Sequence, residues 1–139
     1  MSRPCLTAAA LVAALVLGSC GGSSASDETA VKHAVKGFYN ALADKDAKKA
    51  CNSISKKGRD RITAAASRAG KKQSCSQVFG LILAFGGSAL KQAKDVKVGD
   101  VKIDGDKAKA NVRLGTRKSP IGLVKEEGDW KLSGLNLGS

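Results

Sequence analysis

Four cysteines and one histidine are the residues of this 139-residue chain whose types most restrict the chemistry available to it. Thiols form disulfides, act as nucleophiles or, together with imidazoles, bind metals. A metal site at Cys51 and Cys75 would need further Cys or His ligands, and His33 is the only histidine. The choice between a crosslink, a metal site and a reactive thiol therefore depends on the redox compartment of the chain.

Cys20 follows a segment with the layout of a secretory signal. Arg3 gives a short positive start, residues 8–17 form an almost unbroken apolar run, and small residues precede Cys20. The run is shorter than the roughly 20 residues of a transmembrane helix. Leu17-Gly18-Ser19-Cys20 resembles the bacterial lipobox, whose cysteine is acylated and becomes the first residue after cleavage. We predict a signal peptide over 1–19 and a lipid on Cys20, which anchors the protein to the outer face of the cell membrane. An ordinary secretory signal or an uncleaved anchor is the alternative.

The predicted export of the protein indicates that the remaining cysteines form a disulfide. Cys5 leaves with the signal, so Cys51 and Cys75 remain as an even pair in an oxidising compartment, and we expect a disulfide between them. In the chain-entropy model this bond stabilises the domain by roughly 3–4 kcal/mol. A metal site and a reactive thiol remain the alternatives for this pair, and no metal or cofactor is predicted.

The mature chain reads as a flexible Gly/Ser linker over 20–28 and one domain over 29–139. Val31, Val35, Phe38 and Leu42 recur at helical spacing and predict a first helix. Shorter helical patterns follow near 47–54 and 58–69. Ser74 is the expected N-cap of a fourth helix that is apolar nearly all round, so we expect that helix to be buried or to cover a pocket.

From Asp95 the hydrophobic period changes from helical to two, which predicts strands. Two strands meet at a hairpin turn over 104–106, and Gly99 suggests a bulge in the first of them. Residues 116–120 are expected to form a loop, and two further strands are expected over 121–125 and from Trp130 to Leu137. Helices followed by an antiparallel meander predict an α+β domain, with the N-terminal helices packed on a curved sheet of about four strands.

This order resembles the nuclear transport factor 2-like superfamily, and more narrowly small actinobacterial lipoproteins of that type. The resemblance rests on "FYNALADKDAKKACNSIS", "VKVGDVKIDGDKAKANVRL" and "GLVKEEGDWKLSGL". It implies a cone in which a bent sheet wraps a long helix around an apolar pocket. Eight residues are candidates for lining the pocket or filling the core: Phe38, Tyr39, Leu42, Val78, Phe79, Ile82, Phe85 and Trp130. The superfamily includes cyclases, isomerases and dehydratases as well as binding domains, so the fold does not choose a function.

Proton transfer in such a pocket would need an inward base and a donor to the oxyanion. His33 falls on the polar side of the first helix, and Tyr39 lies at the edge of its apolar stripe, where it could line a pocket mouth or keep its hydroxyl in water. The carboxylates fall in predicted turns, at element ends or beside basic residues, and no two occupy inward strand positions together. No catalytic residue is therefore assigned.

The formal net charge of +12 points to anionic partners. Basic residues cluster between residues 56 and 72, and four of them share one helical side as a candidate anion-binding face: Lys57, Arg61, Arg68 and Lys72. Export excludes nucleic acid and leaves lipid head groups, wall polymers or acidic protein faces. The alternative is a solvated, solubilising face, and the strand lysines fit that interpretation equally well.

Two hypotheses follow from these residues. The favoured one is a lipid-anchored, non-enzymatic binding or interaction module of the cell envelope, which holds a small apolar ligand in the cone or presents its basic face to an anionic partner. The alternative is an isomerase or cyclase-like enzyme with its site in the cone pocket and Tyr39 in it. The sequence leaves open whether the domain forms a homodimer through its exposed sheet face.

Overall fold

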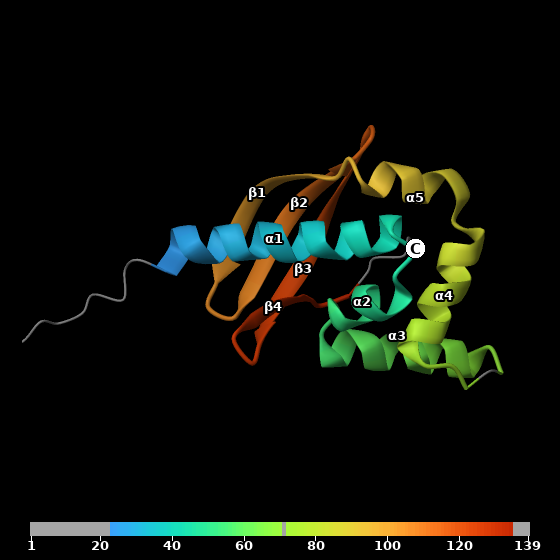
Figure 1. Cartoon of the computed structure of the whole chain (residues 1–139). Coiled ribbons are helices and arrows are strands. Elements are labelled where there is room, and N and C mark those ends of the chain that lie inside the picture. Colours follow the sequence, from blue (N-terminus) through green and yellow to red (C-terminus); the bar gives the residue numbers. More distant parts are fainter. Residues whose placement is uncertain (1–22, 71, 135–139) are drawn as a thin grey trace, which may run out of the picture.

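The computed structural model describes residues 23–70 and 72–134, so the predicted signal peptide and Cys20 lie outside the described residues. Helices precede a sheet, as expected (Figure 1). The helices are α1 (Ser23–Ala43), α2 (Ala47–Asn52), α3 (Lys56–Arg68), α4 (Cys75–Phe85) and α5 (Gly87–Ala93). The strands are β1 (Lys97–Asp104), β2 (Lys107–Leu114), β3 (Arg117–Glu126) and β4 (Asp129–Leu132). No helix in the described part of the chain is long and apolar enough to cross a membrane.

The first helix buries the predicted stripe, with Val31, Val35 and Phe38 almost fully inaccessible. It begins at Ser23, however, so the predicted linker over 20–28 and the domain boundary at 29 are wrong for residues 23–28. Tertiary contacts explain the difference, because the Asp27 carboxylate is held by two side chains of the sheet. An i,i+4 ion pair of 2.6 Å between Glu28 and Lys32 adds local support.

Side-chain caps begin the next three helices. Asp46 accepts a hydrogen bond from the Lys49 N–H of α2, and Ser55 accepts one from the Gly58 N–H of α3. Ser74 caps α4 as predicted and forms a reciprocal capping box with Gln77. The crosslink is confirmed as well: a Cys51–Cys75 disulfide joins α2 to α4, with Cα atoms 5.9 Å apart.

Of the two expectations for α4, burial or the covering of a pocket, full burial is wrong. Its inward side consists of Cys75, Phe79 and Leu83, which recur every four residues. The other side is open, and Leu81, Ile82 and Phe85 are 46%, 40% and 86% exposed. α4 packs mainly against α2 and α3, so only one side of it is covered. The short helix α5, which follows at Gly87, was not predicted.

The sheet is an antiparallel meander in the order β1-β2-β3-β4. The predicted bulge is confirmed by a register shift between Val98 and Val101. The predicted loop over 116–120 is wrong, because β3 already begins at Arg117 and pairs with β2 along its length. Pro120 is tolerated there because β4 pairs only with residues 123–126, which leaves this part of β3 at the edge of the sheet.

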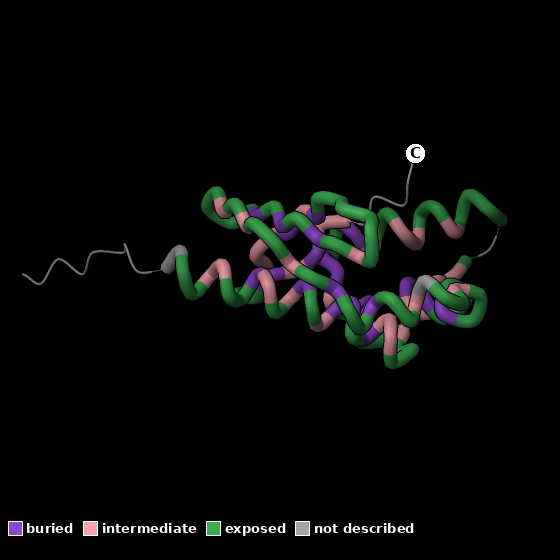
Figure 2. Tube along the Cα trace, turned by 90° about the horizontal axis from the view of Figure 1, so that it is seen from above, coloured by how far each residue is buried: buried purple, intermediate pink, exposed green. Residues whose placement is uncertain are grey.

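The core lies between α1 and one face of the sheet, which we call the inner face. Alternate residues of β2 and β3 fill it, among them Ala108, Ala110, Val112, Ile121 and Leu123. Figure 2 shows the buried positions gathered in the middle of the molecule, between α1 and the strands. The α+β class with helices on an antiparallel four-stranded sheet is therefore confirmed.

Candidate functional site

Five of the eight residues predicted to line a cone pocket or to fill the core lie in or against the core: Phe38, Tyr39, Leu42, Phe79 and Trp130. The ring of Phe38 packs edge to face against Tyr39 and Phe79, with centroids 5.4 and 6.0 Å apart. Leu42 packs against this cluster, and Val78 is half-buried. Ile82 and Phe85 are wrong as pocket residues, because both lie on the exposed side of α4. Phe38, Tyr39 and Phe79 thus belong to the packed core.

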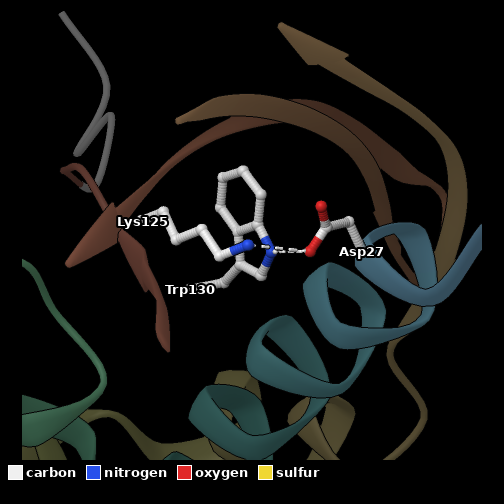
Figure 3. A network of polar contacts seen from close by, with 3 residues as sticks. All are labelled: Asp27, Lys125 and Trp130. Carbon is white, nitrogen blue, oxygen red and sulfur yellow. Dashed lines mark hydrogen bonds and ion pairs between the residues drawn. The ribbon is translucent and has the colours of Figure 1, made fainter. Parts of the chain in front are cut away.

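Trp130 has a different setting, because it belongs to a polar contact that anchors α1 to the sheet (Figure 3). The Asp27 carboxylate accepts hydrogen bonds from Lys125 Nζ at 3.1 Å and Trp130 Nε1 at 3.3 Å. The Lys125 ammonium also lies 5.5 Å from the centre of the Trp130 ring. These two donors lower the pKa of Asp27, so the carboxylate is ionised and committed to holding the helix.

The two candidates for proton transfer are not brought together. His33 is exposed on the polar side of α1, whereas Tyr39 is only 8% exposed. Burial raises the pKa of the Tyr39 hydroxyl, which keeps it protonated, and its ring contacts Phe38. Within residues 23–70 and 72–134, no group of three or more His, Cys, Asp or Glu side chains could hold a metal ion.

The opposite face of the sheet, which we call the outer face, is basic. Strand pairing places six exposed cations on it: Lys97, Lys102, Lys107, Lys109, Arg113 and Lys118. Lys102 lies directly opposite Lys109, and Arg113 lies between Lys97 and Lys118 on the neighbouring strands. Like charges directly opposite one another destabilise a sheet. None of the six forms an ion pair with any residue of the described ranges.

A recess of about 840 Å³ opens between the start of α3 and the outer face. Lys57 and Arg61 border it on the helix, and Lys102, Lys107 and Lys109 border it on the strands. The acids at this recess are Asp104 and Glu126, and Glu126 already accepts hydrogen bonds from the Lys56 N–H. The uncompensated charge of the recess is therefore positive.

Two further recesses extend this one along the outer face. A recess of about 480 Å³ shares Arg61 and Lys109 with the first and reaches Pro120. A third, of about 450 Å³, also contains Pro120 and is bordered by Lys97, Arg113 and Lys118. We call the three together the basic track. Each recess shares a residue with the next, so the track is continuous from α3 to the far end of the sheet.

Two of the four residues of the predicted anion-binding face lie at the basic track, and the other two do not. Lys57 and Arg61 lie at the basic track, whereas Arg68 and Lys72 are exposed but border none of its recesses. The strand cations were missed as members of the site. Their signal was present in the sequence, because Lys107, Lys109 and Arg113 have the same parity in β2 and must share one face.

Comparisons with known proteins give a loose likeness. No protein-family model matches the chain, and no curated protein matches it. The chain is similar to a crystal structure from Campylobacter jejuni described as that of a candidate NTF2-like transpeptidase. The two share 20% identity with a TM-score of 0.44, over 79% of this chain and 98% of the other. The transpeptidase description belongs to that protein, and neither the family nor the activity of this chain follows from it.

Proposed function

We propose that this chain is a lipid-anchored, non-enzymatic interaction module of the cell envelope, of nuclear transport factor 2-like type, that binds an anionic partner through its outer face. One observation carries the proposal: six exposed cations on one sheet face form no ion pair with a described residue. Uncompensated like charges at opposite strand positions cost stability, and an anionic partner would offset that cost.

The interior supports a surface role over a ligand in the cone. The Phe38 ring packs edge to face against Tyr39 and Phe79, so these three candidates for pocket lining lie in the core. The enzyme alternative needs a base beside Tyr39, either His33 or a carboxylate that the fold carries inward, and His33 is exposed. No observation favours the isomerase or cyclase hypothesis over binding.

The positive charge of the outer face also opposes a homodimer that forms through this face. In a homodimer through this face, the Lys97, Arg113 and Lys118 row of one copy would meet cations of the other. Such a pairing is opposed by repulsion between unscreened like charges, so we propose that the outer face of this protein binds a different, anionic molecule.

The anchor is tested in cells that produce the protein. Metabolic labelling with an alkyne fatty acid should tag the wild-type protein, and Cys20→Ala should lose the tag and leave the membrane fraction. Cys5→Ala is the matched control, because Cys5 lies within the predicted signal, and it should keep the tag. Protease added to intact cells or spheroplasts should degrade the anchored protein. An untagged, full-length protein inside the cell would overturn the envelope role.

A further inference from the structure

We propose that the basic track is a binding site for a linear phosphate polymer. The inference rests on the proposed function, in which the partner is anionic, and it names the class of that partner. Its basis is the continuity of three recesses from Lys57 and Arg61 on α3 to Lys97 and Lys118 at the far end of the sheet.

The spacing of the cations along the track suits a repeating anion. On β2, Lys107, Lys109 and Arg113 lie on the outer face two or four residues apart. A strand rises about 3.4 Å per residue, so neighbouring outward positions are about 7 Å apart and the three span roughly 20 Å. An extended chain with one anionic group per repeat can meet several of these cations at once, whereas a single small anion can meet only a few.

The side-chain types favour phosphate. The cations named above for the track are six lysines and two arginines: five of the lysines lie on the strands and Lys57 on α3, and the arginines are Arg61 and Arg113. Lysine binds phosphate as a compact point charge, and the planar fork of arginine matches both phosphate and carboxylate oxygens. Point charges without a preferred plane suit tetrahedral phosphate groups, and the comparison with poly-L-glutamate described below tests this preference against carboxylates.

Other anionic partners fit the track less well. A folded protein interface has an apolar or aromatic centre, and the described aromatic residues lie in the core or, for Phe85, on α4. A bilayer surface is planar and cannot follow a recess between a helix and a sheet.

The experiment uses the acylated mature protein in a nonionic detergent and titrates it with long-chain inorganic polyphosphate at physiological salt. Lys57→Glu/Arg61→Glu should weaken binding by at least about tenfold. Arg68→Glu/Lys72→Glu is the matched control, since it makes the same charge change outside the recesses, and its effect should stay below about threefold. Lys102→Glu/Lys109→Glu tests the sheet side and should weaken binding as much as the first pair. An unchanged thermal midpoint shows that each variant is folded.

Three outcomes would overturn the phosphate site. Equal losses for all three pairs would show that only net charge matters. Poly-L-glutamate or phosphatidylglycerol vesicles that bind as tightly as polyphosphate, with the same ranking of variants, would show a carboxylate or lipid partner and leave the proposed anionic partner standing. Absence of binding to all three probes, with the fatty-acid tag on Cys20 retained, would reject an anionic partner but not the envelope anchor.

Discussion

The two faces of the same four-stranded sheet differ in how their side chains are compensated. On β2, Ala108, Ala110 and Val112 point to the inner face, where α1 and the neighbouring strands cover them. Lys107, Lys109 and Arg113 alternate with them and point to the outer face, where none of the three forms an ion pair with a described residue. The apolar side chains of the inner face are thus buried by other residues of the protein, whereas the cations of the outer face are exposed and form no ion pair with a described residue. This difference between the two faces is the basis of the proposal that an anionic partner binds the outer face.

The largest expected effect comes from the inner face. Phe38→Ala removes a ring that is 1% exposed and packs against Tyr39 and Phe79, so it should lower the free energy of unfolding by about 3–5 kcal/mol. Arg113→Ala on the outer face is the control and should change it by no more than about 0.5 kcal/mol. Urea titrations measure both. A Phe38→Ala cost near that of Arg113→Ala would mean that the interior is not packed and would reopen the pocket hypothesis.

The crosslink should have the next largest effect, because it ties α2 and α4, which lie beside the core and not on the outer face. Cys51→Ala/Cys75→Ala should reduce the free energy of unfolding by about 3 kcal/mol. Reductant should destabilise the wild-type protein similarly and leave the double variant unaffected. Without reductant, alkylation should label neither cysteine. Polyphosphate binding by the folded double variant should be unchanged, and a loss of binding would contradict the separation of the two regions.

A charge reversal on the outer face should stabilise the protein, whereas the two preceding variants destabilise it. Lys109→Glu places a carboxylate opposite Lys102, so it should raise the free energy of unfolding by about 0.2–1 kcal/mol while it weakens polyphosphate binding. The gain should shrink at high salt, because the pair is exposed. Lys91→Glu on α5, outside the sheet, is the control and should change neither quantity. A destabilised Lys109→Glu would show that this lysine has a structural role.

The smallest effect concerns the anchor of α1. The hydrogen bonds from Lys125 and Trp130 lower the pKa of Asp27 below its ordinary value of 3.8. The stabilisation by the ionised carboxylate is therefore complete above that value and is lost as the pH falls toward the lowered pKa. Asp27→Asn should lower the thermal midpoint slightly at neutral pH and reduce its decline in acid. Glu28→Gln on the same turn should retain the acid decline, and parallel profiles for wild type and Asp27→Asn would contradict this role.

Local patterns in the sequence determined the order of the elements and the side-chain parity within them. The stripe of α1, the cap at Ser74, the bulge after Val98 and the pairing of Cys51 with Cys75 follow from short-range periodicity, turn chemistry and cysteine count. The start of α1 could not be derived in this way, because Asp27 is held by residues about one hundred positions away in the chain.

Which side chains remain exposed and without an ion pair depends on tertiary packing. The apolar α4 was expected to be buried, but burial depends on how many neighbours reach a helix, and here they cover one side. In the same way, the position of α3 against the sheet places Lys57 and Arg61 at the recesses and leaves Arg68 and Lys72 away from them. The spacing of residues along one helix does not predict this position. Composition set the amount of positive charge, and packing decided where that charge forms a continuous surface.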